Sequence, residues 1–132
     1  MANPSKDKGN RFERQIVHLC TIWGIKALRA WGSNGQSLGM HEEVDVLIED
    51  DFRVQAKCRK RLPMFLKPSE EVDCTVFKED RGDIYIMMRF EDFLAEMKRN
   101  EDIKKTIGED TCKLIKEKLN KWKFVYYVRK EQ

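Results

Sequence analysis

The chain has 132 residues, of which 41% are hydrophobic and 37% are charged, a composition typical of one globular domain with a heavily charged surface. The formal net charge is only +3, so affinity for a polyanion would have to come from local clusters of basic residues. No apolar run is long enough for a membrane span, and the N-terminus lacks the apolar segment of a signal peptide. We therefore expect no membrane partner and no cleaved leader.

The four cysteines are far apart in the sequence and form no Cys-x-x-Cys pair: Cys20, Cys58, Cys74 and Cys112. Such spacing is not typical of a zinc site or of a disulfide framework. We expect reduced and largely buried thiols in a cytoplasmic protein.

The first predicted element is a helix that begins near Lys8, after a loose polar arm over residues 1–7. Its apolar residues recur at helical spacing up to Trp23, and Gly24 follows as a C-terminal stop. Glu13 flanks this apolar stripe and is therefore a candidate site residue. The alternative interpretation is an acidic residue that only stabilises the helix dipole.

Residues 25–31 predict a strand, and residues 32–39 form a loop with three glycines and two serines. Glycines beside an anion site allow close approach of the backbone, although most such loops are only connectors. His41, which follows the loop, is expected at the surface.

Residues 44–57 predict a β-hairpin, because two apolar strands of suitable length flank an acidic turn at residues 49–51. Side chains alternate between the faces of a strand, so Asp45, Gln55 and Lys57 should converge on the face opposite the apolar residues. A carboxylate, an amide oxygen and an ammonium on one rigid face could hold a hard cation and a water beside a phosphate. The alternative is a solvated face with a weak exposed ion pair.

Charge is sharply segregated along this hairpin. Residues 42–51 include six acids and no base, whereas residues 53–67 include six bases and no acid. A charge run is usually a solvated face. An acidic pocket next to a basic strip is also what a metal-assisted enzyme acting on a phosphate backbone requires.

The remaining sequence predicts alternating helices and strands, among which the strongly apolar residues 84–90 are long enough for a central strand. The other predicted elements are a short helix at 64–70, a strand at 73–77, a helix at 91–99, a lysine-rich helix at 110–120 and a closing strand at 121–130. Residues 98–132 contain eleven bases and six acids, and their aromatic residues suit nucleic-acid contact or a dimer interface, or an ordinary edge strand.

This order of elements resembles the PD-(D/E)XK nuclease superfamily, and within it the archaeal and phage-type Holliday junction resolvases. The resemblance covers residues 8–97 and depends on Lys-Gly-Asn-Arg-Phe-Glu-Arg at 8–14, Arg-Ala-Trp-Gly-Ser at 29–33, Val-Asp-Val-Leu-Ile at 44–48 and Val-Gln-Ala-Lys at 54–57. Residues 80–94 are also similar to phage members.

Two positions depart from the family pattern. Val44 stands where a proline usually precedes the motif aspartate, and this change affects only the entry to the strand. Gln55 stands where the motif has Glu or Asp, and a neutral amide leaves one negative charge fewer for Mg²⁺. Gln-x-Lys variants occur in the superfamily, but weaker metal binding or lost catalysis is an alternative.

The resemblance implies an α/β, restriction-endonuclease-like fold with a mixed central β-sheet flanked by helices. It implies a single nuclease domain over 1–132, with a core at 8–97 and a basic helix and strand extension at 98–132. The implied activity is that of a Mg²⁺-dependent endodeoxyribonuclease that hydrolyses phosphodiester bonds in branched DNA, in the cytoplasm of a bacterial, archaeal or phage-infected cell.

The resemblance also implies a role for each candidate residue. Mg²⁺ or Mn²⁺ would be held by Asp45, Gln55 and the Ala56 carbonyl, with Glu13 completing the site directly or through water. Lys57 would orient the attacking water. Ser33, with Ser37 as the second choice, would contact the scissile phosphate.

Contacts to the DNA backbone are expected from Ser33 and from six basic residues: Arg11, Arg14, Arg53, Arg59, Lys60 and Arg61. The family implies a homodimer that recognises DNA shape rather than base sequence. Three alternatives stay open: an endonuclease for another DNA substrate, a catalytically silent DNA-binding protein of the same fold, and an unrelated α/β protein with a charged surface.

Overall fold

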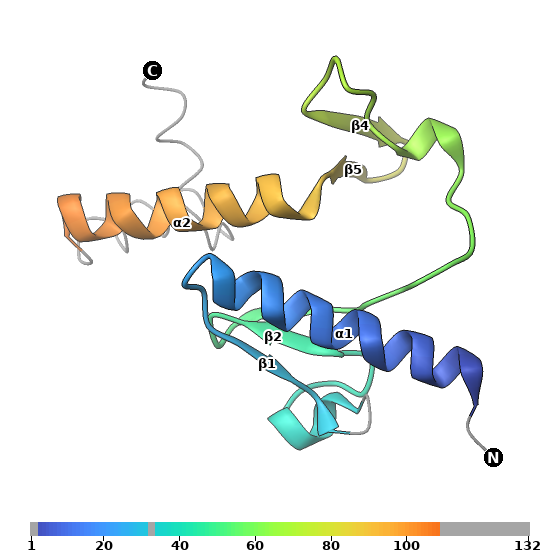
Figure 1. The fold of residues 1–132 in the computed structure, drawn as a ribbon. Helices are drawn as coiled ribbons and strands as arrows, with labels where there is room; N and C mark the ends of the chain where they lie inside the picture. The colour runs from blue at the N-terminus through green and yellow to red at the C-terminus, as the bar shows by residue number, and fades with distance from the viewer. Residues whose placement is uncertain (1–2, 32–33, 109–132) are drawn as a thin grey trace.

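The computed structural model describes residues 3–31 and 34–108, and it combines two long helices with two small antiparallel sheets (Figure 1). The predicted elements at 110–120 and 121–130, and Cys112, lie outside the described residues. In chain order the elements are α1 (Pro4–Ile22), β1 (Ala27–Arg29), the 3₁₀ helix η2 (Gly35–Leu38), β2 (Val46–Ile48), β3 (Phe52–Val54), the 3₁₀ helix η3 (Met64–Leu66), β4 (Cys74–Lys78), β5 (Ile84–Met88) and α2 (Phe90–Ile107).

Helix α1 begins four residues earlier than predicted, so the expectation of a loose arm is wrong for residues 4–7. The side chain of Asn3 caps the helix by accepting hydrogen bonds from the backbone N–H groups of Ser5 at 3.1 Å and Lys6 at 3.4 Å. Pro4 occupies the first turn, where no backbone donor is needed. At the other end Gly24 has a φ of +69°, which confirms the predicted glycine stop.

The predicted hairpin is confirmed as β2 and β3, and β1 pairs with the other edge of β2 to give a three-stranded antiparallel sheet. The register places Val46 opposite Val54 and Ile48 opposite Phe52. Glu49 and Asp50 both have positive φ, 52° and 66°, the backbone conformation of a tight hairpin turn.

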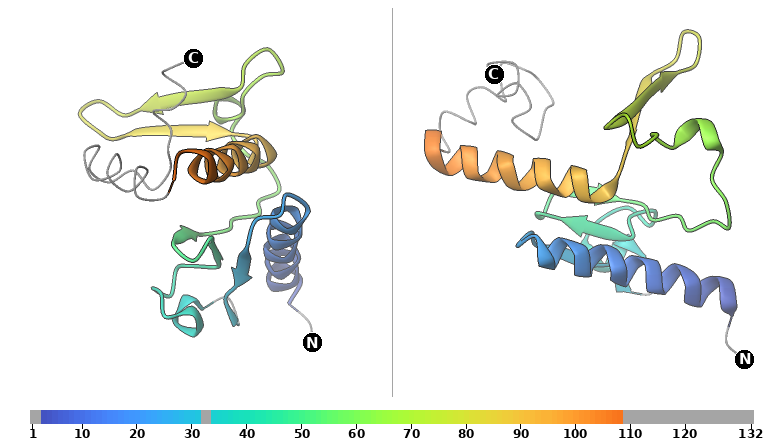
Figure 2. Two further views of the ribbon diagram at one scale, coloured as in Figure 1. Left: turned by 90° about the vertical axis from the view of Figure 1, so that its left-hand side faces the viewer. Right: turned by 45° about the horizontal axis from the view of Figure 1, so that its top comes forward.

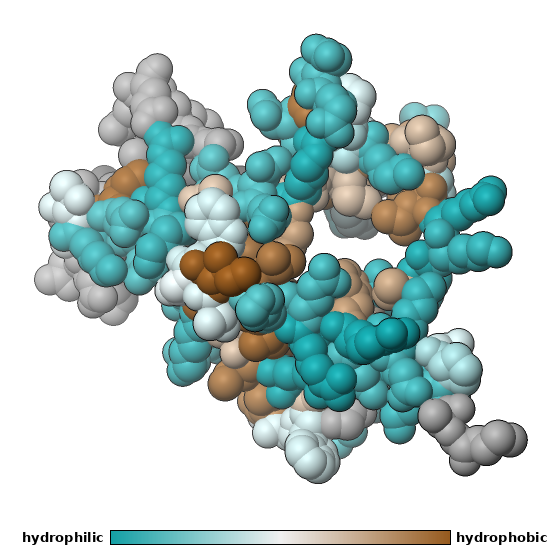
Figure 3. Space-filling model, viewed as in Figure 1, coloured by the Kyte–Doolittle hydropathy of each residue, from teal (hydrophilic) through white to brown (hydrophobic). Residues whose placement is uncertain are grey.

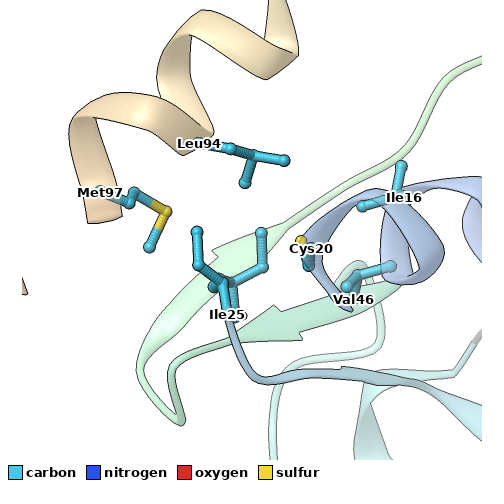
Figure 4. Packing of buried hydrophobic residues seen from close by; sticks show 7 residues of the cluster. Ile16, Cys20, Ile25, Val46, Leu94 and Met97 are labelled. Atoms are coloured by element: carbon cyan, nitrogen blue, oxygen red, sulfur yellow. The ribbon is translucent and has the colours of Figure 1, made fainter. Parts of the chain in front are cut away.

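The main core lies between this sheet and the two helices (Figure 4). Its buried side chains come from α1, β2, α2 and the segment after α1: Ile16, Cys20, Ile25, Val46, Ile48, Leu94 and Met97. This confirms the predicted apolar stripe of α1, and burial of each large aliphatic side chain contributes about 1.5–3 kcal/mol. Burial also raises the pKa of the Cys20 thiol to about 11, so this thiol stays protonated and packs as a small apolar group.

Strands β4 and β5 form a separate hairpin, which extends away from α1 and the first sheet (Figure 2). The α/β class is confirmed, but the strands in the described ranges form two antiparallel sheets and not one mixed sheet. The predicted strand at residues 84–90 is confirmed as β5, but within the described ranges it lies at the edge of a two-stranded sheet and is not central. A continuous apolar run indicates a strand but does not say what covers it, and β5 pairs only with β4 among the described residues.

Neither described helix is long and apolar enough to cross a bilayer. The cysteines within the described part of the chain, Cys20, Cys58 and Cys74, are free thiols, of which only Cys20 is buried.

Candidate active site

Asp45 stands one residue before β2, at a point where all three strands of the first sheet are hydrogen-bonded together. Its backbone N–H donates to the Val54 carbonyl at 2.8 Å, and its own carbonyl accepts from the Ala30 N–H at 2.8 Å. The side-chain oxygen Oδ2 accepts from the Ala56 N–H at 2.7 Å. The carboxylate is therefore half-buried and held at the end of β3.

Gln55 and Lys57 extend from β3 on the face predicted for them. Arg53, Gln55 and Lys57 are exposed, whereas Phe52, Val54 and Ala56 alternate with them and are half-buried. The ladder puts Gln55 across from Asp45, because Val54 is opposite Val46 and its carbonyl accepts from the Asp45 N–H. The structure thus brings Asp45, Gln55 and Ala56 together, while Lys57 follows further along the same face.

Glu13 lies in the buried stripe of α1 and is only 4% exposed. Its Oε2 accepts a hydrogen bond from Arg29 Nε at 2.8 Å, and Arg29 Nη2 donates to the Asn10 side-chain oxygen at 2.9 Å. Arg29 ends β1 next to Ala30, whose N–H bonds to the Asp45 carbonyl. The guanidinium therefore compensates the buried charge of Glu13 and connects α1 to the strand end that carries Asp45.

Arg29 is the residue that sequence reasoning missed. It lies in one of the matched segments, but a single base at the end of a short strand has no distinctive spacing. The available signal was the strand period, which puts Arg29 on the same face as Ala27, a residue that packs against the core. A base on an inward face requires an acidic partner, and Glu13 supplies it.

The polar side chains of the loop before Asp45 form hydrogen bonds with backbone groups of the same segment. Ser37 Oγ accepts from the Trp31 N–H at 2.8 Å and donates to the Asn34 carbonyl at 3.0 Å. The Asn34 side chain accepts from the Gln36 N–H at 2.9 Å. Ser37 therefore has a structural role in this loop, and Ser33 lies outside the described residues.

Gly35 is the tightest point of this loop and gives a direct test of its packing. A Cβ at Gly35 would overlap the His41 carbonyl oxygen and come within 2.9 Å of Val44 Cβ. Since the backbone has to move, Gly35→Ala should lower the free energy of unfolding by about 1–3 kcal/mol in urea denaturation.

Gly9→Ala is the matched control, because a Cβ at Gly9 within α1 meets no atom within 4 Å. This variant should be more stable than the wild type by about 0.5–1 kcal/mol. A tolerated alanine at residue 35 would contradict the packing described here.

The six basic residues among the predicted DNA contacts are surface residues: Arg11, Arg14, Arg53, Arg59, Lys60 and Arg61 are exposed. Arg11 and Arg14 line an open cleft of about 470 Å³ on α1, together with Pro4, Asp7 and Asn10. Exposed guanidinium groups are free to approach a phosphate backbone without a desolvation cost inside the protein.

The described carboxylates are not arranged to bind a metal ion by themselves. Within residues 3–31 and 34–108, no group of three or more His, Cys, Asp or Glu side chains is arranged to hold an ion. The physical reasons are that Gln55 is neutral and that the Glu13 carboxylate is bound by Arg29. Next to Asp45 the register places Gln55, whose side chain carries an amide oxygen, and Ala56, whose N–H binds the Asp45 carboxylate.

Comparison with known proteins gives one result. The family model described as "Archaeal holliday junction resolvase (hjc)" matches residues 4–126. No curated protein and no solved structure matches the chain. The matched range contains α1, the first sheet with its loop, the β4–β5 hairpin and α2, so every candidate site residue lies within it.

Proposed function

The chain belongs to the archaeal Holliday junction resolvase family, whose members are nucleases of the PD-(D/E)XK type, and we propose that it is a metal-dependent endonuclease that cuts four-way DNA junctions. The observation that carries this proposal is the position of Asp45. Its carboxylate is anchored by the Ala56 N–H at 2.7 Å, in the Gln-x-Lys segment that follows β3.

The donor chemistry around Asp45 fits Mg²⁺ or Mn²⁺. Both ions prefer oxygen ligands, and Mg²⁺ commonly keeps several waters and takes only one or two carboxylates from the protein. We assign the ion to Asp45, Gln55 and the Ala56 carbonyl, with Glu13 completing the site directly or through water. When bound, the ion would polarise the scissile phosphate and lower the pKa of a water.

The protein residues have separate tasks around that site. The Lys57 ammonium would orient the attacking water and stabilise the charge that develops on phosphorus. Ser33 would contact the scissile phosphate. Arg29 acts as a positioning residue, because its guanidinium holds the Glu13 carboxylate at 2.8 Å and would not itself contact the ion or the DNA.

The basic strip after β3 would bind the DNA backbone. Each phosphate contact contributes about one to the slope of log affinity against log salt concentration. Replacement of Arg59, Lys60 and Arg61 by glutamine should therefore reduce the slope by about one for each contact that is lost. Affinity should fall for every DNA tested, measured by fluorescence anisotropy at several salt concentrations.

Lys78→Gln is the control for the strip, because Lys78 is an exposed base at the end of β4, outside the strip. Its slope of log affinity against log salt concentration should equal that of the wild type. An unchanged slope in the triple variant would remove the strip from the interface.

We further propose that the protein acts as a homodimer. The two strands to be cut in a four-way junction are related by symmetry, and a two-fold dimer presents one site to each of them. Recognition would depend on the shape and deformability of the junction.

Cleavage of a labelled four-way junction, compared with a linear duplex of the same sequence, tests the proposed function. Paired symmetric cuts in the junction alone, present with Mg²⁺ or Mn²⁺ and absent with EDTA, are the expected result. Equal metal-dependent cutting of both DNAs would keep the nuclease and reject the junction selectivity.

Gln55 supports a second candidate function, a junction-binding protein without catalysis. The amide removes one negative charge from the proposed metal site. This candidate predicts junction binding in EDTA and no cleavage with either metal. The variant Gln55→Glu would then be expected to gain metal-dependent cleavage. A gain would mean that Gln55 weakens the metal site, and no gain would mean that the chain has no metal site at this position.

A further inference from the structure

Two large apolar side chains are exposed next to each other on the 3₁₀ helix η3. Met64 is 78% exposed and Phe65 is 74% exposed, whereas Leu66 at the end of η3 is half-buried. Neither Met64 nor Phe65 is part of the core between the first sheet and the helices. Figure 3 shows apolar atoms on the surface at the upper right, in the region of η3 and the β4–β5 hairpin. Exposed apolar side chains with polar residues around them are typical of a binding surface.

The sequence around η3 is basic. Residues 52–69 include six bases and no acid, and all six bases are exposed. The first acid after this segment is Glu70, which lies 3.7 Å from the guanidinium of Arg89. The two apolar side chains are therefore surrounded by positive charge, and this charge favours a polyanion as their partner over an apolar protein surface.

The backbone of η3 is held at both ends. The Leu66 N–H donates to the Pro63 carbonyl at 3.1 Å, which closes the turn. After η3, the Arg89 guanidinium donates to three carbonyls within residues 68–72 at 3.1–3.4 Å. The exposed pair is thus presented on a fixed turn, so little backbone entropy is lost when its side chains enter a ligand.

This turn is also near the candidate active site along the chain. Phe65 follows Lys57 by eight residues, and eight extended residues span at most about 29 Å. One turn of B-DNA is about 34 Å long. A DNA with one phosphate at Asp45 and Lys57 therefore extends past η3 within a single helical turn.

Apolar side chains that enter DNA do so between neighbouring bases. Phe and Met are among the residues that form such wedges, and the energetic cost is the unstacking of one base step. In a linear duplex each base pair is stacked on both sides, whereas stacking is interrupted at the branch point of a four-way junction. A wedge therefore enters most easily at a branch point, where an aromatic ring can stack on a base of any sequence.

We propose that Met64 and Phe65 form a wedge that stacks on the bases at the branch point of a DNA junction, while the basic residues around η3 bind the adjacent phosphates. The Phe65 ring stacks on a base, and the flexible Met64 side chain fills the space beside it. The wedge gives the chain a preference for branched DNA over linear duplex. This inference rests on the proposed function, because a junction is the DNA that the wedge would recognise.

Phe65→Ala tests the wedge by fluorescence anisotropy in EDTA, where no cleavage interferes. The affinity for a four-way junction should fall about tenfold or more, and the affinity for a linear duplex of the same sequence should stay within about twofold. Phe65→Trp should keep the junction affinity, because an indole ring also stacks on a base. Ile22→Ala is the matched control, since Ile22 is 64% exposed at the end of α1, outside the basic segment, and both affinities should be unchanged.

Cross-linking tests where the wedge lies on the DNA. A photoreactive p-benzoylphenylalanine in place of Phe65 should cross-link to the nucleotides next to the branch point, as mapped by primer extension. The same residue in place of Ile22 should give no cross-links at the branch point.

Urea denaturation separates the wedge from a structural role of Phe65. Because the side chain is 74% exposed, Phe65→Ala should leave the midpoint of unfolding unchanged. A lower midpoint would mean that another segment of the chain covers Phe65, and this result would overturn the wedge.

Three further results would overturn the wedge: an equal loss of affinity for junction and duplex in Phe65→Ala, unchanged junction affinity in that variant, or cross-links away from the branch point. Binding to phosphatidylserine vesicles that Phe65→Ala abolishes, with junction affinity kept, would assign the surface to a membrane instead. Junction cleavage is scored separately. A chain that cuts junctions but keeps full junction affinity in Phe65→Ala refutes the wedge alone, and a chain whose junction preference depends on Phe65 but which never cuts refutes the nuclease alone.

Discussion

Asp45→Asn is expected to lower the rate of metal-dependent junction cleavage by a factor on the order of 10³, while junction affinity in EDTA stays close to that of the wild type. The substitution preserves shape, and the Asn side-chain oxygen can still accept the Ala56 N–H bond that is 2.7 Å long in the wild type. What is lost is the negative charge. Single-turnover cleavage of the labelled junction measures the rate, and anisotropy measures the affinity.

The specificity of this effect is checked by Glu43→Gln, which removes an exposed carboxylate two residues before Asp45. This control should cleave at nearly the wild-type rate. Both variants lose one negative charge near the hairpin, so a difference between their rates reports the position of the Asp45 carboxylate. Full cleavage by Asp45→Asn, or an equal loss in Glu43→Gln, would remove Asp45 from the catalytic centre.

The elements with strong local signals could be predicted from the sequence. The apolar stripe of α1 and the alternation along residues 52–57 are set by side-chain period, and the hairpin turn by its acidic residues. For this reason the positions of Asp45 and Gln55 relative to each other were also predictable: a two-residue period and one turn determine which side chains share a face.

The features that depend on tertiary contacts could not be predicted. Residues 84–88 have the composition of a buried strand, but whether a strand is central is decided by what packs on it, and among the residues that the structure describes β5 pairs only with β4. The predicted start of α1 was four residues late. The polar character of residues 4–7 alone indicates a loose arm, whereas the Asn3 cap and Pro4 in the first turn favour a helix start.

The Glu13–Arg29 ion pair is another feature that depends on tertiary contacts and could not be predicted. The two residues are in different elements, and neither has a spacing that points to the other. Only the packing of α1 on β1 brings them within 2.8 Å. Burial then decides their importance, since a carboxylate away from water needs a partner whereas an exposed one does not.

Arg29→Met should therefore lower the free energy of unfolding by about 2–4 kcal/mol at neutral pH, because it leaves the Glu13 charge buried without its guanidinium. The side chains of Arg29 and Glu13 are 27% and 5% exposed. Lys26→Met is the matched control, since Lys26 and Asp50 form a shorter ion pair of 2.6 Å whose side chains are 57% and 67% exposed. Loss of that exposed pair should change the stability by less than about 1 kcal/mol.

The double variant Glu13→Gln/Arg29→Met separates charge from packing. A neutral amide in the α1 stripe needs no cation, so the double variant should regain much of the stability that Arg29→Met loses, as measured by urea denaturation of all four proteins. Equal losses in Arg29→Met and Lys26→Met would mean that burial does not set the strength of the pair. Equal losses in the single and double variants would assign the effect to lost packing of the arginine stem against β1, and Arg29 would then have no electrostatic role in positioning Glu13.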